Sequence, residues 1–285
     1  MSSNVTILTD SSAYLPQELV DQHPIDVIPL MLVWGDAVYR DGVDIKADTF
    51  YEKLAHSDTL PSTSQTSVHE YEEAYRRLLD AGQDVLVMPI SSGLSASFES
   101  ARQAKINLKT DRVEVMDTRL VSMALGFQVL TVARAAQAGA SLAECKTIAK
   151  KAYDQIGVYF SVDTLEFLHR GGRINTAKRL MGTALNLKPI LEIRDGKIEA
   201  VGSVISQRKA MDRLVQLVET RIGGRQPVRL SVFHAGIPEI ASNFKKRVDK
   251  HFNPVESILT FVSPVVGAHV GPGTISLAFM AGEVE

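Results

Sequence analysis

Short apolar runs alternate with amphipathic stretches through the first half of the chain. Three of these runs are rich in β-branched residues, end in a loop with several hydroxyl side chains, and precede a stretch of helical periodicity. They span residues 5–8, 85–89 and 113–116. Strands that alternate with helices pair in parallel, so the pattern predicts a parallel sheet, whose ligands bind beyond the carboxyl ends of its strands. The hydroxyl-rich loops lie at those ends.

An insertion separates the first two of these units. Two apolar runs, residues 27–33 and 38–40, flank the tetrapeptide Trp-Gly-Asp-Ala at 34–37. Two apolar runs separated by a short polar turn predict a β-hairpin. We place the insertion at about residues 25–48.

The pattern changes after about residue 157. Asp195-Gly196 lies between two apolar runs and is a strong signal for a two-residue hairpin turn. A helix is expected over residues 176–185, and hairpins are mixed with helices up to the end, which indicates an α+β arrangement. The sequence therefore predicts an α/β fold of two domains: residues 1–157 form a parallel-sheet α/β domain that carries the hairpin, and residues 158–285 form an α+β domain.

The composition is that of a globular protein. Hydrophobic residues make up 45% of the 285 positions and charged residues 22%, which argues against a disordered chain and fits about two domains. The 31 basic and 33 acidic residues give a net charge of −2, so bulk charge offers no attraction to nucleic acid or to an anionic membrane. The start of the chain lacks the features of a signal peptide, and the longest strongly apolar run, residues 27–34, is too short to cross a membrane. We therefore expect a cytoplasmic protein.

The single cysteine, Cys145, excludes an intramolecular disulfide and a zinc site built from cysteines. It follows Ser141 and Glu144, whose capping-box spacing predicts a helix, and it lies on the apolar face of that helix. We therefore expect a core residue and not a reactive thiol. The sequence patterns of a P-loop, a dinucleotide-binding turn and a His-Glu-x-x-His zinc site are absent, so neither a nucleotide site nor a metal site is predicted.

Ser95 lies just past the second apolar run, where a helix is expected to begin. The unpaired N–H groups and the partial positive charge of a helix N-terminus suit a carboxylate or a phosphate. Ser95 can equally serve only as the cap of its own helix. The sequence leaves both interpretations open.

Two further segments carry side chains that can donate hydrogen bonds. The segment Pro-Ser-Thr-Ser-Gln at 61–65 places Thr63 and Gln65 on one side if it is extended, and otherwise it is a polar linker into the next helix. The segment 265–273 surrounds His269 with three glycines and a proline, which predicts a tight turn. His269 can hydrogen-bond an anionic ligand there, or it can be a structural histidine.

Arg170 and Arg173 bracket Gly171-Gly172 after a predicted short helix. Basic residues near the C-terminus of a helix are favourable in themselves. Because a guanidinium presents planar, forked donors, these arginines can instead contact a phosphate or a protein partner.

Taken together and in order, these segments resemble the DegV family, which includes the fatty-acid-binding subunits of bacterial fatty acid kinase. The resemblance covers about residues 5–281 and depends on the ordered set of motifs. The segments that carry it are residues 9–12 (Thr-Asp-Ser-Ser), 61–65, 90–95 (Ile-Ser-Ser-Gly-Leu-Ser), 165–174, 187–190 (Leu-Lys-Pro-Ile) and 269–273 (His-Val-Gly-Pro-Gly).

The resemblance implies a two-domain protein that holds a long-chain fatty acid between its domains. It implies that Thr63 and Ser95 bind the acyl carboxylate, that His269 is a third contact, and that Arg173, with Arg170 nearby, contacts a partner or a phosphate. It further implies a non-catalytic, cytoplasmic bacterial subunit, without a cofactor or metal, that presents the carboxylate to a separate ATP-dependent kinase. The product would be an acyl phosphate for phospholipid synthesis, passed on in a transient contact with a membrane or an acyltransferase.

The chain departs from the pattern of its relatives at two places. Relatives often read Leu-Ser-Gly-Thr-Tyr where this chain has Leu-Ser-Ala-Ser-Phe at 94–98, so the methyl group of Ala96 narrows the space expected near the head group. Relatives often carry a basic residue near the position of Ile205. The isoleucine side chain cannot make the partner contact that a basic side chain would make.

We expect the carboxylate to be held by neutral donors, because these leave an oxygen more available to attack the γ-phosphate of ATP than an arginine clamp would. Two alternatives follow from the same residues. Residues 93–97 approach the pattern Gly-x-Ser-x-Gly, which would make the chain a serine hydrolase with Ser95 and His269. The chain can also be a carrier of another amphipathic carboxylate or of an isoprenoid.

Overall fold

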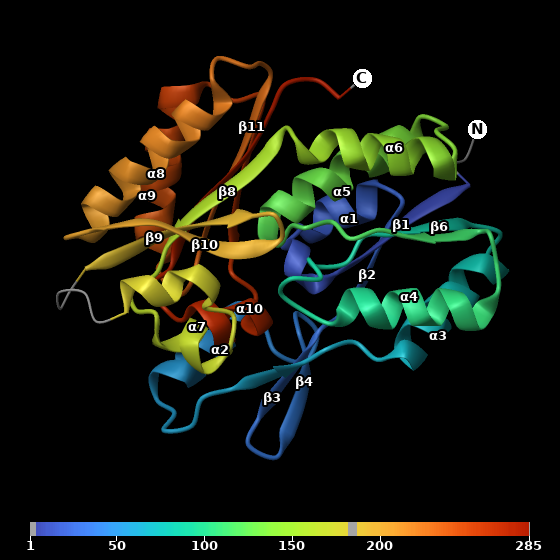
Figure 1. Cartoon of the computed structure of the whole chain (residues 1–285), viewed down its shortest axis with the longest axis horizontal. Coiled ribbons are helices and arrows are strands. Elements are labelled where there is room, and N and C mark those ends of the chain that lie inside the picture. Colours follow the sequence, from blue (N-terminus) through green and yellow to red (C-terminus); the bar gives the residue numbers. More distant parts are fainter. Residues whose placement is uncertain (1–3, 182–186, 285) are drawn as a thin grey trace.

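Three β-sheets organise the part of the chain that the computed structural model describes, residues 4–181 and 187–284 (Figure 1). A four-stranded sheet comes from the first half of the chain, a six-stranded sheet from the second half, and a small three-stranded sheet from the insertion and the segment after it. The predicted class, a parallel-sheet α/β unit followed by an α+β unit, is confirmed. The division near residue 157 stays a prediction; strand β8 (Ile156–Ser161) belongs to the six-stranded sheet.

The four-stranded sheet is parallel throughout. Its strands lie in the order β2 (Ile25–Ile28), β1 (Val5–Asp10), β6 (Asp84–Val87) and β7 (Val113–Val115). Parallel sheets are covered on both faces, and this one is covered by helices. Helices α3 (Val68–Asp80) and α4 (Ser97–Leu108) pack on Leu8 and Val85, whereas α5 (Ser122–Gln137) packs on Ile7 and Leu86 from the other side.

The six-stranded sheet is mixed. Its order is β10 (Lys197–Val204), β9 (Lys188–Arg194), β8, β13 (Ile275–Ala281), β11 (Val228–His234) and β12 (Glu256–Phe261). All pairs are antiparallel except β11 with β12. Helices α8 (Gln207–Ile222) and α9 (Pro238–Phe252) cover one face. Because α5 packs against the other face as well as against the parallel sheet, it lies between the two sheets and most of its side chains are buried.

The insertion begins later than the apolar pattern indicates. Strands β3 (Met31–Trp34) and β4 (Ala37–Arg40) form the predicted hairpin, and helix α2 (Ala47–Ala55) follows. A single strand over residues 27–33 is wrong: Pro29 cannot donate a backbone hydrogen bond, and the run divides there. Its first part, β2, joins the parallel sheet. The polar segment 61–65 is not a simple linker, because β5 (Ser62–Ser64) pairs with β3.

Two other local expectations differ from the structure. The tight turn predicted over residues 265–273 is wrong for its first half, because helix α10 (Pro264–Val270) begins at the proline, which suits the first helical turn, and ends at Gly271. The helix predicted over residues 176–185 is observed as a 3₁₀ helix, η2 (Asn175–Leu180), and residues 182–185 lie outside the described part of the chain.

The capping box of helix α6 (Leu142–Tyr153) is confirmed. Ser141 accepts a hydrogen bond from the N–H of Glu144, and the Glu144 carboxylate accepts one from the N–H of Ser141. Cys145 follows in the first turn of α6 and is fully buried, as expected. Burial raises the pKa of its thiol to about 11.

The two large sheets touch through the tip of the β9–β10 hairpin. The backbone of Asp195 and Gly196 has φ values of 49° and 77°, as the predicted turn requires. The Ser91 hydroxyl, in the loop after β6, donates to the carbonyl oxygen of Gly196 at 2.8 Å. A Cβ atom on Gly93 would lie only 2.5 Å from the same oxygen. The contact therefore depends on glycine at both sides.

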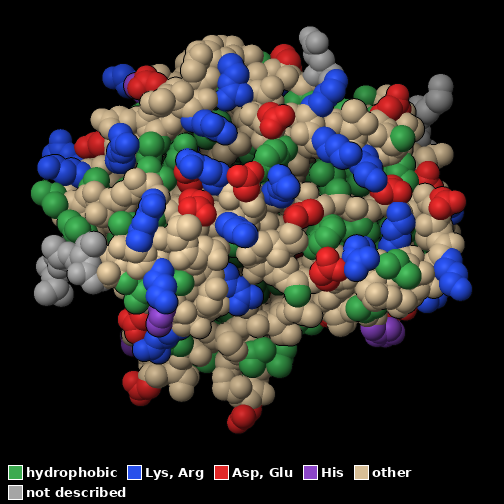
Figure 2. All heavy atoms as spheres, viewed as in Figure 1, with side chains coloured by type: hydrophobic (Ala, Val, Ile, Leu, Met, Phe, Trp, Pro, Cys, Tyr) green, Lys and Arg blue, Asp and Glu red, His purple; other side chains and the backbone are tan. Residues whose placement is uncertain are grey.

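Basic and acidic side chains are interspersed over the face shown in Figure 2, as the small net charge leads one to expect. Several of them form ion pairs, such as Arg112 with Asp84 at 2.7 Å. Exposed pairs of this kind contribute little to stability.

Two buried carboxyl groups fix the segment that follows β1: Asp10 holds it to the loop after β6, and Asp41 holds it to the insertion. Asp10, at the end of β1, accepts hydrogen bonds from the N–H groups of Ser12 (3.0 Å) and Ile90 (2.7 Å). Asp41, just after β4, accepts one from the Ser11 hydroxyl at 2.6 Å. Burial raises the pKa of Asp10, and it raises the pKa of Asp41 to about 6.

Asp41→Asn should make the stability less dependent on pH. Because the pKa of Asp41 is about 6 in the folded protein against 3.8 in a model peptide, the folded protein keeps a proton between these values that the unfolded chain releases. The free energy of unfolding therefore falls as the pH rises through this window. Asparagine cannot lose that proton, so the denaturant midpoint of the variant should fall less steeply from pH 4 to 6.

Asp44→Asn is the matched control. Hydrogen bonds from Arg40 lower the pKa of the exposed Asp44 carboxyl to about 2, so its contribution is lost only as the pH falls below about 4. The slope between pH 4 and 6 should stay that of the unchanged protein. An equal slope in Asp41→Asn would contradict the role given to Asp41.

Candidate functional site

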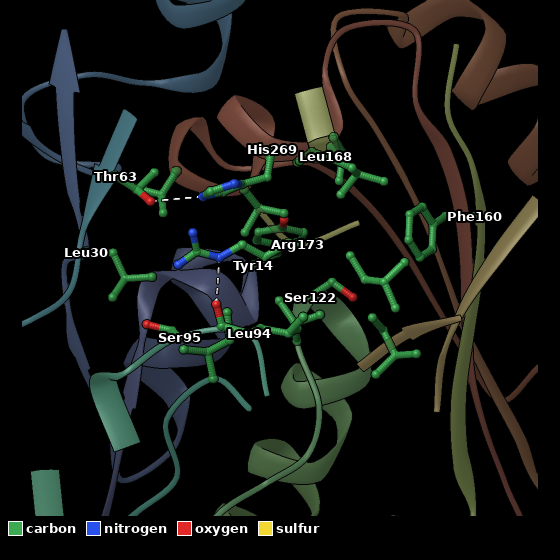
Figure 3. A pocket seen from close by; sticks show the side chains of 18 of the residues that line it. Tyr14, Leu30, Thr63, Leu94, Ser95, Ser122, Phe160, Leu168, Arg173 and His269 are labelled. Atoms are coloured by element: carbon green, nitrogen blue, oxygen red, sulfur yellow. Dashed lines mark hydrogen bonds between the residues drawn. The ribbon is translucent and has the colours of Figure 1, made fainter. Parts of the chain in front are cut away.

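A cavity of about 300 Å³ lies between the two large sheets (Figure 3). Its volume is at the lower end of the range of small-molecule sites. Its walls come from the loops beyond β1 and β6, from the start of α5, from β5 and α10, and from the six-stranded sheet. The loops lie at the carboxyl ends of parallel strands, where the sequence predicts a ligand site.

One part of the cavity is apolar. Phe160 and Phe233 lie on the face of the six-stranded sheet that faces the cavity, and both pair with Ser276 of β13, one on each side. Figure 3 shows Phe160 well away from Thr63 and His269. The other apolar lining residues are Tyr14, Leu30, Ile90, Leu94, Ala96, Val121, Val158, Leu168, Ile193, Ile198, Val262, Val265, Val266 and Val270.

The other part brings together the three predicted ligand-binding residues. Thr63 of β5 lies 2.9 Å from Nε2 of His269 in α10, measured from its hydroxyl oxygen. Ser95 lies across the cavity from them, with the guanidinium of Arg173 between (Figure 3). These side chains come from positions up to 206 residues apart, so only the folded chain assembles them.

Ser95 is not the N-cap of α4, although it does help to satisfy the start of that helix. The N-cap residue is Ala96, which offers no side-chain hydrogen bond. The Ser95 hydroxyl accepts a hydrogen bond from the N–H of Ser97 at 3.2 Å and lies 2.9 Å from the Ser97 hydroxyl. Ser95 also lines the cavity, and its contact with a carboxylate or a phosphate stays a prediction.

The ring of His269 is fixed by close packing. A Cβ atom on Gly171 would lie 2.2 Å from Nδ1 of His269, so the ring rests directly on the glycine backbone. The buried Nδ1 has no hydrogen-bond partner among the described residues. Burial, together with the charge of Arg173, lowers the pKa of His269 to about 4. The ring is therefore neutral at neutral pH. In the tautomer with the proton on Nε2, the ring would donate to the Thr63 hydroxyl oxygen, and the Thr63 hydroxyl would keep its own proton free to donate.

Arg173 brings a positive charge into the cavity. Its Nε donates to the carbonyl oxygen of Leu94 at 3.0 Å and its Nη1 to that of Gly171 at 2.6 Å. It forms no ion pair with any carboxylate of the described residues. Sequence spacing does not reveal that Arg173 turns inward, so the cavity holds a guanidinium beside the predicted neutral donors. Which of these groups bind a head group stays a prediction.

Arg170, by contrast, lies outside the cavity. It pairs with Glu166, one turn earlier in helix α7 (Glu166–Arg170), at 2.6 Å, and both side chains are exposed. The two arginines that the sequence treats together thus have different surroundings.

Sequence reasoning missed Tyr14 and Ser122, which also line the cavity. Tyr14 follows the Thr-Asp-Ser-Ser motif, and Ser122 begins α5. Both have a positive φ, of 57° and 61°, which no pattern of apolar residues reveals.

The geometry does not support the serine hydrolase. The nearest hydrogen-bond partners of Ser95 are atoms of Ser97, whereas His269 pairs with Thr63. A hydrolase needs the serine bonded to its general base, and a histidine with a pKa near 4 is a weak base.

Among residues 4–181 and 187–284, no group of His, Cys, Asp or Glu side chains is arranged to hold a metal ion. Within the same residues, each helix is too short or too polar to cross a membrane.

Comparisons with known proteins agree on one family. The DegV family model, described as "Uncharacterised protein, DegV family", matches residues 4–282. A DegV domain-containing protein of Streptomyces coelicolor is 36% identical over 279 residues, which cover 97% of this chain and 98% of the relative.

Two solved structures of similar proteins have the same fold. One, described as showing fatty acid binding of a DegV family protein from Thermus thermophilus, is 31% identical with a TM-score of 0.92, over 98% of this chain and 99% of the other. The second, DegV of Bacillus subtilis, described as a fatty acid binding protein, is 30% identical with a TM-score of 0.89, over 98% of this chain and all of the other.

Gly171→Ala should displace the ring of His269 without unfolding the protein. The new methyl group would occupy the position of Nδ1, so the ring must turn and its hydrogen bond to Thr63 is lost. In NMR spectra of the ring nitrogens, the His269 signals should move, and its pKa should rise toward the usual value of a histidine.

Gly202→Ala is the control, because a Cβ atom on Gly202 meets no other atom within 4 Å. It should leave the His269 signals in place. Unchanged His269 signals in Gly171→Ala would show that the glycine does not position the ring.

Proposed function

Because the chain belongs to the DegV family, we propose that it binds a long-chain fatty acid and presents the carboxylate to a separate ATP-dependent kinase subunit. The observation that carries the proposal is a single cavity with an apolar part and a polar end, at which Thr63, Ser95, His269 and Arg173 converge. The descriptions of the two similar structures as fatty acid binding support the same ligand class.

The apolar part suits an acyl chain on energetic grounds. Burial of about 15 methylene groups gains on the order of 12 kcal/mol, at roughly 0.8 kcal/mol each. The loss of translational freedom and the ordering of the chain offset several kcal/mol of this gain or more. Tight binding therefore requires that the carboxylate does not add a further penalty, and an unpaired buried carboxylate would.

The polar end can satisfy a carboxylate. The hydroxyl groups of Thr63 and Ser95 donate hydrogen bonds, and the N-terminus of α4 next to Ser95 adds partial positive charge. Arg173 supplies a full positive charge within the cavity. A carboxylate bound there would also offset the positive charge that Arg173 places near His269, so a bound carboxylate is compatible with the neighbouring histidine.

The polar end is also the end that opens to solvent. Ser64, Gln65 and Ala96 line the cavity and are exposed. A carboxylate bound between Thr63 and Ser95 lies close to the surface, where a partner's ATP can reach it. One carboxylate oxygen would attack the γ-phosphorus, a new P–O bond would form, and ADP would leave, which yields an acyl phosphate.

The chain itself supplies no nucleotide site in this scheme. It has neither a P-loop nor a dinucleotide-binding pattern. ATP and catalysis would come from the kinase subunit, and the dependence on ATP favours a cytoplasmic location. The acyl phosphate would then pass to an acyltransferase or to the membrane surface for phospholipid synthesis.

Replacing both hydroxyl donors should weaken fatty acid binding strongly while the fold survives. In Thr63→Val with Ser95→Ala, the carboxylate loses two hydrogen bonds of the kind that each contribute about 1.5–3 kcal/mol, so fatty acid affinity should fall by roughly 100-fold or more. Fluorescence titration with a labelled fatty acid measures the affinity, and thermal unfolding checks the fold. Acyl phosphate formation with the kinase subunit should be lost in parallel.

Ser62→Ala is the matched control, since Ser62 lies on the same strand, is exposed and does not line the cavity. It should bind as the unchanged protein does. Normal binding by the double variant would overturn the placement of the carboxylate.

The protein should carry its ligand through purification. Native mass spectrometry of protein freshly purified from a bacterial host should show an added mass of about 250–290 Da, that of a 16- or 18-carbon fatty acid, because burial of so many methylene groups makes release slow. Lipid extraction then identifies the acid. An isoprenoid, a bound nucleotide or an empty cavity would count against the proposal.

A further inference from the structure

Ser122 is a hydroxyl group without a partner inside the cavity. Its side chain lines the cavity and only 4% of the residue is exposed. Its oxygen is buried and makes no hydrogen bond to any of the described residues. Figure 3 places Ser122 away from the Thr63–His269 pair, on the side of the cavity toward Phe160. An unpaired buried hydroxyl costs about 1–3 kcal/mol, so it requires an explanation.

The backbone gives no reason for a serine at this position. Ser122 has a φ of 61°, a region that favours glycine. It does not cap α5, because the N-cap residue is Val121, which offers no side-chain hydrogen bond. Glycine would relieve the backbone strain, and alanine would fill the same space without a buried oxygen. A serine here is favourable only when something in the cavity pairs with its hydroxyl.

The start of α5 adds further polar groups at the same place. The first intrahelical bond runs from the N–H of Leu125 to the carbonyl oxygen of Val121. The N–H groups of a first helical turn have no acceptor one turn earlier within the helix, and α5 is 16 residues long. A helix N-terminus carries partial positive charge, which favours an oxygen atom as the group that meets it.

A second hydroxyl lines the apolar part of the cavity. Ser276 lies between Phe160 and Phe233 in the six-stranded sheet and is 1% exposed. Thr274, which directly precedes β13, shows how a buried hydroxyl is usually satisfied. Its hydroxyl lies within 3.1 Å of the carbonyl oxygens of Val270 and Gly271. The Ser122 hydroxyl has no such carbonyl partner among the described residues.

We propose that the ligand carries an oxygen substituent along its chain, and that Ser122 binds it. The ligand class is a hydroxy or oxo fatty acid, whose carboxylate lies at Thr63 and Ser95 and whose second oxygen meets Ser122. This inference rests on the proposed function, since it specifies the acyl chain that the same cavity takes. An unsubstituted acyl chain would leave the Ser122 hydroxyl unpaired. An acyl chain with an oxygen substituent pairs that hydroxyl and keeps its own oxygen hydrogen-bonded.

Binding of paired acids to the delipidated full chain tests the inference. Octadecanoic acid is compared with octadecanoic acids that carry one hydroxyl group, with its position varied along the middle of the chain. The unchanged protein should bind at least one positional isomer roughly tenfold more tightly than the other isomers, because a hydrogen bond forms only where the hydroxyl reaches Ser122. Ser122→Ala should remove that preference and leave the affinity for octadecanoic acid unchanged or higher.

Two further variants keep the result interpretable. Ser122→Gly removes the same hydroxyl and suits the positive φ, so it replaces the alanine variant if that one unfolds. Ser62→Ala, outside the cavity, should keep the preference. Equal affinities for all isomers, or an equal loss for octadecanoic acid and the hydroxy acids in Ser122→Ala, would overturn the role of Ser122. Failure of every acid to bind would instead overturn the proposed function.

Discussion

The cavity exists because two sheets approach each other without filling the space between them. The approach is set by a backbone contact, in which the tip of the β9–β10 hairpin meets the loop after β6 at Gly93 and Ser91. Helix α5 fills one end of the gap between the sheets, and its N-terminus, at Ser122, faces the cavity. Beyond its first turn the space stays open, and the polar side chains of the site reach it from the loop after β6, from β5, from α10 and from the segment after α7.

The site then combines groups that differ in charge. A histidine held neutral by burial, two hydroxyls and one guanidinium surround the same small volume. The neutral ring is hydrogen-bonded to the Thr63 hydroxyl. Arg173 has no carboxylate partner among the described residues, so its charge would balance that of a bound carboxylate. A fully cationic site would hold an anion more firmly but would also make its oxygens poorer nucleophiles. The observed combination of neutral donors and one guanidinium lies between a fully neutral site and a fully cationic site.

Many strands and turns of the fold could be predicted from the sequence, because they depend on short stretches of the chain. β-branched runs followed by hydroxyl-rich loops identify the parallel strands, and Asp195-Gly196 identifies a turn because both positions need a positive φ. Family resemblance supplied Thr63, Ser95 and His269. The inward turn of Arg173 and the unpaired hydroxyl of Ser122 could not be predicted, because they depend on packing between segments far apart in the chain. The helix that begins at Pro264 was missed because the segment 265–273 holds three glycines and a proline, which indicate a turn, although only Gly267 lies within α10.

Cys145 has a practical consequence. It is the only cysteine of the chain, it is buried in α6, and its thiol is protonated at any ordinary working pH. Thiol-directed reagents therefore meet no competing target in the folded protein. A fluorophore attached through a cysteine introduced at the exposed rim of the cavity, at Ser64 for example, would label one site and report ligand exchange there in real time.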